Sequence, residues 1–251
     1  MITIDLIGKN ALVTGGTRGI GRAITRRLAE AGASTAAVYH ADEAAAHESL
    51  HERGLYGTGA HRNYQADVGD PAHLRTLAER VLSDFDNTLD ILILNAAQMG
   101  NAPIADISLP VWQRAFDVNL TGPFLLTQAM LPAMPRGASI VAIGSGAGHD
   151  AMSGGFATYG ATKSGLLMFI RDLAQDIGPQ GIRANVVSPG GTDTSFGSGP
   201  AMPNHQPNPA EHNALRRVGI PDDVAKAVLF LCSDLAAFIT GQALRVNGAA
   251  V

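Results

Sequence analysis

A tyrosine and a lysine stand four residues apart in the stretch YGATK, residues 159–163. Residues i and i+4 lie on the same face of a helix, so the phenol and the ammonium can point into one cleft. A free phenol has a pKa of about 10, and a cation one turn away stabilises the phenolate and is expected to lower that pKa. The pair therefore predicts a general acid/base at Tyr159, although YxxxK taken alone is more often an ordinary exposed pair.

The choice of cation also favours chemistry, because the 18 basic residues include only three lysines, at positions 9, 163 and 226. A lysine ammonium is a compact charge with three donors, so Lys163 can hydrogen-bond a ribose and pass protons through water. Ser145 precedes Tyr159 by fourteen residues and ends a predicted strand in VAIGSGAG. The carboxyl end of a strand is where α/β sheets place ligand-binding residues.

A glycine-rich turn, VTGGTRGIG, separates a predicted strand from a predicted helix near the start of the chain. Glycines at 15, 19 and 21 let the backbone turn tightly and approach a pyrophosphate at the positive end of the helix. A simple tight turn is the alternative, but the strand–turn–helix context favours a dinucleotide site. The residues expected to contact the cofactor here are Gly15, Thr17, Arg18, Gly19, Ile20 and Gly21.

The residues after the second predicted strand indicate which dinucleotide binds. An NAD site typically has an acid at the end of this strand, about 20 residues beyond the glycine turn, to bind the ribose 2′-hydroxyl. In AAVYHAD, Tyr39 and then His40 take that place, while Asp42 and Glu43 are expected to open the next helix. Arg18, unless it is only a solvated surface charge, can grip a 2′-phosphate with two donors. The sequence favours NADP(H) over NAD(H), with His40 as a further contact.

Short apolar runs alternate with helical stretches along the whole chain. The predicted strands lie in NALVTGG, STAAVY, HRNYQADV, LDILILNAA, ASIVAIGS, IRANVVSP and QALRVNG, and helices are expected at about 110–133, 156–177 and 221–232, among others. This alternation implies right-handed βαβ units and an α/β fold of Rossmann type, with a doubly wound parallel sheet between helices on both faces. Without a linker or an internal repeat, residues 1–251 are expected to form a single domain.

One segment departs from this alternation. Residues 195–210 are rich in Gly, Pro, Ser and Asn and show no periodicity. A loop this long is usually a lid or a binding loop, or else disordered, and we expect a substrate lid at about 195–213. The apolar residues expected to line the substrate pocket, each of which is more often core or cover when taken singly, are Met99, Met152, Phe156, Phe196 and Met202.

Composition excludes several classes of function. The net charge of −4 disfavours a nucleic-acid binder, and Cys232, the only cysteine, excludes an internal disulfide and a thiolate metal cluster. The first residues, MITIDLIGKN, do not have the layout of a signal peptide, and no window reaches the roughly 20 apolar residues of a membrane span. We expect a soluble, cytoplasmic protein without nucleic-acid or membrane partners.

Two other groups of residues near the predicted site could suggest hydrolase or metal chemistry, but neither has the spacing that such chemistry needs. His149 and Asp150 follow Ser145 too closely for a conventional serine-hydrolase relay, and AIGSGAG lacks the strand-to-helix context of a nucleophile elbow. His205 and His212 have no H-E-x-x-H spacing and are expected to be polar loop residues. No metal site is predicted.

Taken in order from ALVTGGTRGIG to FITGQALRVNG, these motifs resemble the short-chain dehydrogenase/reductase family, and the 3-oxoacyl carrier-protein reductases within it. The resemblance implies hydride transfer between NADP(H) and a carbonyl or secondary alcohol substrate. It implies that Tyr159 is the general acid/base, that Lys163 lowers its pKa and binds the nicotinamide ribose, and that Ser145 hydrogen-bonds the reacting oxygen. Asn119, in FDVNLTG, matches the residue that holds a relay water, although it is alternatively a helix-kink residue.

The resemblance also assigns further cofactor contacts beyond the glycine turn. Those implied on the adenosine side are Asp67, Val68, Asn95 and Ala96, and those implied on the nicotinamide or phosphate side are Pro189, Gly190, Thr192 and Thr194. Asp67 is also plausible as a loop cap. The chain departs from the family in LNAA, where Leu94 and Ala97 replace an asparagine and a glycine, and in the ending VNGAAV.

The predicted helix over 156–177 carries an apolar stripe that is either core or subunit contact. Its members are Leu166, Leu167, Ile170, Leu173, Ala174 and Ile177. In the family this helix and the one at 110–133 commonly form a dimer face, so the resemblance implies a homotetramer. Two rival functions stay open: a regulator that binds NADP without turnover, and a lyase or dehalogenase on the same scaffold. The four intact catalytic residues and the intact glycine turn disfavour both.

Overall fold

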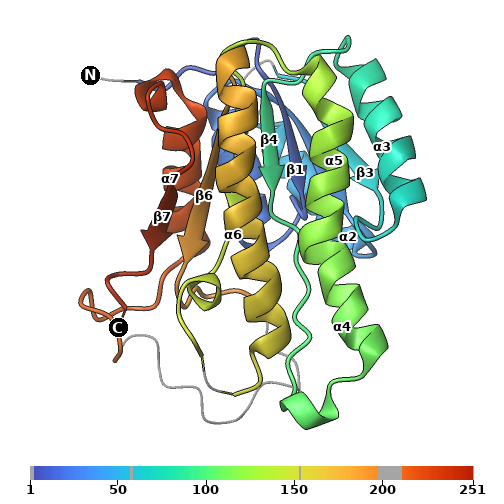
Figure 1. Ribbon diagram of the computed structural model, residues 1–251. Helices are drawn as coiled ribbons and strands as arrows, with labels where there is room; N and C mark the ends of the chain where they lie inside the picture. Colours follow the sequence, from blue (N-terminus) through green and yellow to red (C-terminus); the bar gives the residue numbers. More distant parts are fainter. Residues whose placement is uncertain (1–2, 57–58, 153, 197–210, 251) are drawn as a thin grey trace.

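A parallel sheet forms the centre of the molecule (Figure 1). The computed structural model describes residues 3–56, 59–152, 154–196 and 211–250. In this part of the chain the sheet has seven strands in the order β3-β2-β1-β4-β5-β6-β7, and every neighbouring pair is parallel. The strands are β1 (Asn10–Thr14), β2 (Ser34–Tyr39), β3 (His61–Gln65), β4 (Ile91–Leu94), β5 (Ser139–Ile143), β6 (Arg183–Pro189) and β7 (Ala243–Val246).

Helices cover both faces of the sheet. Figure 1 shows α5 and α6 lying across the near face, with α3 beyond α5. The helices are α1 (Gly19–Glu30), α2 (Glu43–Arg53), α3 (Pro71–Asp84), α4 (Leu109–Phe116), α5 (Gly122–Met130), α6 (Ala157–Ile177) and α7 (Pro221–Cys232). A π-helical turn, η2 (Asp117–Thr121), joins α4 to α5, so the segment predicted as one helix over 110–133 changes its winding in the middle.

Two buried cores follow from the alternation of side chains along the strands. Leu12 faces the core under α3, α5 and α6, whereas its neighbours Ala11 and Val13 face the core under α1 and α7. Both faces of the sheet are therefore apolar, which explains the uninterrupted apolar runs of β4 and β5. The predicted fold class is confirmed. One domain over 1–251 stays a prediction.

The order of the strands places a crevice above β1 and β4. The chain runs from β1 outward to β3, then returns to β4 on the other side of β1 and continues outward to β7. At such a reversal the connections leave the neighbouring strands on opposite faces, and the space between them at the carboxyl ends of the strands binds ligands. The glycine turn and Asn95 lie at this point, directly after β1 and β4.

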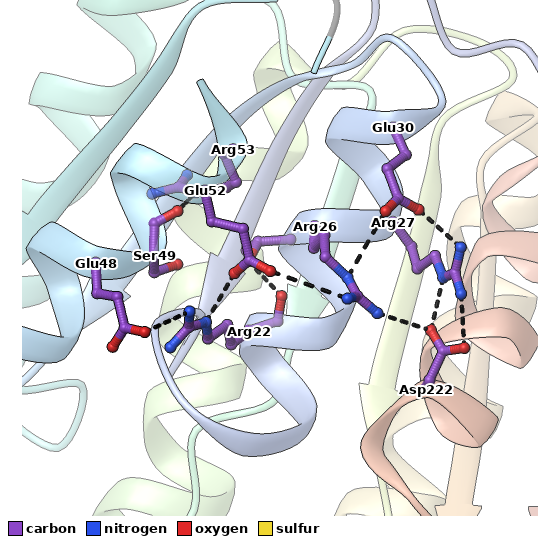
Figure 2. Close-up of polar contacts among 10 residues, drawn as sticks. Arg22, Arg26, Arg27, Glu30, Glu48, Ser49, Glu52, Arg53 and Asp222 are labelled. Atoms are coloured by element: carbon purple, nitrogen blue, oxygen red, sulfur yellow. Dashed lines mark hydrogen bonds and ion pairs between the residues drawn. The ribbon is translucent and has the colours of Figure 1, made fainter. Parts of the chain in front are cut away.

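A chain of ion pairs holds α1 between α2 and α7 (Figure 2). The Arg27 guanidinium donates two hydrogen bonds of 2.6 Å to the Asp222 carboxylate on α7, and Arg26 Nη2 lies 3.2 Å from the same carboxylate. On the other side of α1, Arg22 donates to Glu52 on α2 at 2.8 Å. The hydrogen bond from Arg27 is the main reason why the pKa of Asp222 lies far below its usual range. These contacts fix the position of the helix that follows the glycine turn.

The apolar stripe of α6 is core and not subunit contact. All six of its members are buried inside this chain, so the stripe does not support the dimer face that we expected from it. The outer face of α6 presents Met168 to solvent instead. The stripe is wide because α6 packs against the sheet at β6 and also against η2 and α4.

Candidate active site

The backbone of the glycine turn packs closely on itself and against Asn95, the residue that follows β4. Gly15 has a φ of +63°, and a Cβ placed on Gly21 would lie 2.0 Å from the Gly15 carbonyl oxygen, so no other residue fits at position 21. The Asn95 amide donates to the carbonyls of Thr14 and Gly15 at 2.8 and 3.1 Å. Asn95, expected on the adenosine side, thus acts on the turn itself.

The first turn of α1 is free to receive an anion. Arg18 precedes α1 without a side-chain cap, and the first turn of the helix carries no acid. The helix N-terminus therefore presents N–H groups and positive potential to the crevice, as a pyrophosphate requires. Of the other turn residues, Thr17 is buried and Ile20 packs on the core beneath. The cradle that only glycine can form, together with this uncapped helix, fits a dinucleotide.

The loop after β6 reaches the glycine turn. Pro189 ends β6, and the Gly190 N–H donates to the Val246 carbonyl at 3.1 Å, which ties the loop to β7. The Thr192 hydroxyl donates to the Gly190 carbonyl at 3.0 Å. Thr194 lies in van der Waals range of Gly19, since a Cβ at Gly19 would be 3.4 Å from its methyl group. Of the four contacts predicted in this loop, Thr194 is the one that lies against the glycine turn, and the other three stay predictions.

Charged side chains surround the end of β2. Arg18 Nη1 lies 3.2 Å from an Asp42 carboxylate oxygen, and the other oxygen of Asp42 accepts from the Ala45 N–H at the start of α2. Asp42 therefore opens α2 as expected, but it also holds Arg18, which the sequence did not indicate. Its two carboxylate oxygens are thus engaged by the Arg18 guanidinium and by the first turn of α2.

Asp67 has the loop-cap role expected as its alternative, while its cofactor contact stays a prediction. Its carboxylate accepts from the Gly69 N–H at 2.9 Å, as a loop cap, and from Arg114 at 2.8 Å. Partial burial acts to raise the pKa of Asp67, but the hydrogen bonds from Arg114 and Gly69 outweigh it and the pKa is lowered. His40 Nε2 lies 4.0 Å from the second carboxylate oxygen, so the end of β2 meets the end of β3 here. Val68, the next residue, belongs to the core.

Tyr159 and Ser145 come together at the carboxyl end of β5. Tyr159 lies in the first turn of α6, and Ser145 opens the short helix η4 (Gly146–Gly148), where its hydroxyl accepts from the Ala147 N–H at 3.2 Å. Burial raises the pKa of Tyr159 to about 12, and a hydrogen bond with Ser145 acts against that rise. The expectation of a lowered pKa is therefore wrong for the protein on its own, because loss of solvent outweighs the neighbouring polar groups.

Lys163 lies one turn beyond Tyr159 and is buried, with 2% of its surface exposed. Its ammonium donates to the Ile143 carbonyl at 2.7 Å and lies 5.6 Å from the centroid of the Tyr159 ring. Burial lowers the pKa of Lys163 to about 8. The predicted geometry is present, with phenol and ammonium on one side of α6, but burial acts on both groups against their charged forms.

Asn119 is fully engaged in the π-helical turn η2. Its side chain exchanges hydrogen bonds with the Gln98 backbone, accepting at 2.7 Å and donating at 2.8 Å, and donates to the Thr162 hydroxyl at 3.0 Å. Thr162 in turn donates to the Tyr159 carbonyl at 2.8 Å. Asn119 therefore joins the segment after β4 to the helix that carries Tyr159. It is a positioning residue in this structure: its place in η2 agrees with the helix-kink alternative, and the relay water expected of it stays a prediction.

Two residues that the sequence did not single out also organise the site. The Thr14 hydroxyl accepts from the N–H groups of Asn95 and Ala96 at 2.9 and 3.1 Å, which joins β1 to the segment after β4. Thr162 provides the link to Asn119 described above. Their only signal in the sequence is position, since Thr14 directly precedes the glycines and Thr162 directly precedes Lys163.

Neither alternative chemistry has support in the structure. His149 Nε2 lies 2.9 Å from the Ser188 hydroxyl, and Asp150 pairs with Arg245 at 2.8 Å, so neither residue serves Ser145 as a relay. Within residues 3–56, 59–152, 154–196 and 211–250, no group of His, Cys, Asp and Glu could hold a metal ion, and none of the helices is long and apolar enough to span a membrane. His205 and Met202 lie outside the described residues, as does the middle of the expected lid, 197–210.

Comparison with known proteins places these motifs in one family. A family model described as enoyl-(acyl carrier protein) reductase matches residues 15–249. The 3-oxoacyl-[acyl-carrier-protein] reductase FabG of Aquifex aeolicus is 36% identical over 247 residues, which cover 98% of each chain.

Two solved structures are similar over nearly the full length. A short-chain dehydrogenase from Burkholderia cenocepacia in complex with NADP is 34% identical, with a TM-score of 0.90 over 97% of this chain and 98% of that one. A blue fluorescent protein from a metagenomic library in complex with NADPH is 36% identical, with a TM-score of 0.91 over 98% of each chain. The chain belongs to the short-chain dehydrogenase/reductase family of oxidoreductases.

Proposed function

We propose that this protein is an NADP(H)-dependent oxidoreductase that interconverts a ketone and a secondary alcohol. The observation that carries the proposal is the convergence of Ser145 and Lys163 on the Tyr159 side chain, next to a turn that fits a dinucleotide. NADP and NADPH are present in two similar structures, and Arg18 lies at the edge where a 2′-phosphate would extend. The proposed contacts are those of the glycine turn, the end of β2 and the loop after β6.

The chain's own residues supply the proton and the orientation. When bound, the nicotinamide supplies a hydride for reduction or accepts one for oxidation. In reduction, the carbonyl carbon gains the hydride, and the Tyr159 hydroxyl gives its proton to the carbonyl oxygen while Ser145 hydrogen-bonds that oxygen. Ketone, NADPH and a proton thus become alcohol and NADP⁺. Because the pKa of Tyr159 is raised to about 12, the phenol is protonated near neutral pH, the form that reduction needs.

The buried position of Lys163 costs the fold stability. A lysine pKa lowered from 10.5 to about 8 corresponds to a loss of about 3 kcal/mol of stability while the ammonium is charged. No carboxylate of the described residues offsets this cost, since burial is the only influence on the pKa of Lys163. An ammonium here would stabilise negative charge that develops on the phenol, and it would donate hydrogen bonds to a ribose.

We propose in addition that the protein acts in the cytoplasm as a homotetramer. The support within the chain is the exposed apolar pair Phe124 and Met168, on the outer faces of α5 and α6, which a second copy would cover. Light scattering should give the mass of four chains, and the mass of a single chain at micromolar concentration would contradict the assembly.

Removing the Tyr159 hydroxyl is expected to abolish turnover and leave cofactor binding intact. Tyr159→Phe should lower kcat for NADPH-dependent ketone reduction by about 10²- to 10⁴-fold, because the proton donor is lost. The dissociation constant of NADPH, measured by fluorescence, should stay within twofold. Tyr56→Phe, a matched change after α2, serves as the control. Turnover retained in Tyr159→Phe would contradict the mechanism, and no turnover of any ketone by the wild type would favour the non-catalytic NADP-binding regulator.

Arg18 is expected to distinguish the two dinucleotides. Arg18→Ala should weaken NADPH about 10- to 100-fold through loss of a charge-assisted contact and leave NADH within twofold. Asp42→Asn keeps an oxygen for the cap of α2 and removes the charge opposite Arg18, so it should tighten NADPH alone. Arg75→Ala, on the exposed side of α3, controls for net charge. Equal losses for both cofactors after Arg18→Ala would contradict the 2′-phosphate assignment.

Lys163→Met is expected to stabilise the protein while it inactivates the enzyme. In the wild type the folded state loses the Lys163 proton near pH 8 and the unfolded state near 10.5, so the unfolded state binds more protons between these values and stability rises with pH. This rise should amount to about 1 kcal/mol between pH 8 and 9 in urea unfolding. It should vanish in Lys163→Met and persist in the exposed control Lys226→Met. The same pH dependence in all three proteins would show that Lys163 is not buried as a cation.

A further inference from the structure

Aromatic rings flank the catalytic phenol on two sides. The Phe156 ring, directly before α6, lies 6.4 Å from the Tyr159 ring at an interplanar angle of 68°, and the Phe196 ring, beyond the loop after β6, lies 6.2 Å away at 49°. Phe156 is buried, whereas Phe196 keeps 45% of its surface exposed. Phe196 therefore covers the phenol and still offers much of its own area to a ligand.

Apolar side chains complete the surroundings of Tyr159. Ala147 and Phe156 form a small buried cluster with Tyr159, and Met99 packs against it. Met99, Phe156 and Phe196 were expected to be pocket residues, and all three lie by Tyr159: the two phenylalanines contact its ring, and Met99 packs against its cluster. A substrate whose carbonyl reaches Tyr159 would thus meet the hydrocarbon side chains of these three residues.

The charges near this cluster are already neutralised. Asp150 and Arg245 pair with each other at 2.8 Å, and burial lowers the pKa of His149, which contacts Ser188. A cavity of about 490 Å³, which Phe156 and Ala147 help to line, has only His149 and Asp150 as titratable groups among the described residues that line it.

The chain between β6 and α7 also offers little to an anion. Residues 195–210 contain neither lysine nor arginine. Of the arginines that follow, Arg216 donates to the Glu211 carbonyl at 3.0 Å, and Arg217 forms two hydrogen bonds with Asp223. A backbone carbonyl leaves the charge of Arg216 intact, so a phosphate-bearing arm, or an acidic carrier protein that delivers one, would find this one cation there and no cluster of them.

We propose that the substrate is a free, uncharged ketone, or its alcohol, with an aromatic or similarly bulky apolar group beside the reacting carbon, and not a carrier-bound acyl group. Phe196 supplies the ring that selects this group, by an edge or offset contact of the kind it already makes with Tyr159. The inference rests on the proposed function, since it takes Tyr159 as the proton donor. It separates this chain from the similar reductases whose name specifies a carrier-bound substrate.

The test compares two uncharged diketones and one carrier-bound substrate. 1-Phenyl-1,2-propanedione and 2,3-butanedione share the reactive group and differ in the ring, and acetoacetyl-acyl carrier protein supplies the carrier. With the wild type and NADPH, kcat/KM should be at least about tenfold higher for the phenyl diketone than for either other substrate. Phe196→Ala should reduce the phenyl-to-methyl ratio about tenfold, and Phe196→Tyr, which keeps a ring, should preserve it.

A second phenylalanine-to-alanine variant controls for a general effect of removing a ring on the stability of the fold. Phe238→Ala removes a fully exposed ring between η6 (Asp234–Ala236) and β7, at the end of the sheet away from the site, and should leave the ratio unchanged. Preference for the carrier-bound substrate, or an equal fall for both diketones in Phe196→Ala, would overturn the inference while turnover by Tyr159 stands. If no substrate oxidised NADPH, the proposed function itself would fall.

Discussion

A buried ammonium is the constraint around which the catalytic side of this protein is arranged. Lys163 reaches from α6 to the carbonyl of Ile143 at the end of β5, so the helix cannot shift along the sheet without losing the hydrogen bond of that charge. The turn η4 fits against the same residue so closely that a Cβ on Gly148 would lie 2.9 Å from the Lys163 carbonyl carbon. Ser145 opens η4, and its distance from Tyr159 is therefore set by the packing around Lys163.

The cofactor side of the crevice depends on backbone contacts rather than on buried charge. Thr14 and Asn95 bond the end of β1 to the segment after β4, and Asn119 bonds that segment to α6. A continuous series of hydrogen bonds thus runs from the glycine turn to the helix of Tyr159. The two halves of the site come from motifs more than a hundred residues apart in the chain, and the reversal of strand order between β1 and β4 brings them together.

Periodicity predicted the fold because the sheet is covered on both faces, which makes its strands short apolar runs between amphipathic helices. The helix at 221–232 and the opening of α2 by Asp42 were predictable from local signals alone. The helix-kink alternative for Asn119 pointed to this place, but the π-helical winding and the hydrogen bond to Gln98 were not predictable, because they depend on tertiary contacts. The direction of the pKa shift of Tyr159 was not either, since the helix spacing gives the distance to a cation but not the amount of solvent removed. The pairing of Arg18 with Asp42 depends likewise on how β2 and α1 are placed in space.

The approach of α1 to the glycine turn has a genetic consequence. A Cβ on Gly21 would meet the Gly15 carbonyl oxygen at 2.0 Å, and that oxygen belongs to backbone that Asn95 holds in place. Alanine, the smallest replacement, adds this atom, and every other missense codon adds it with more besides. Position 21 therefore accepts only synonymous changes of its codon, while other positions of α1 can change their amino acid.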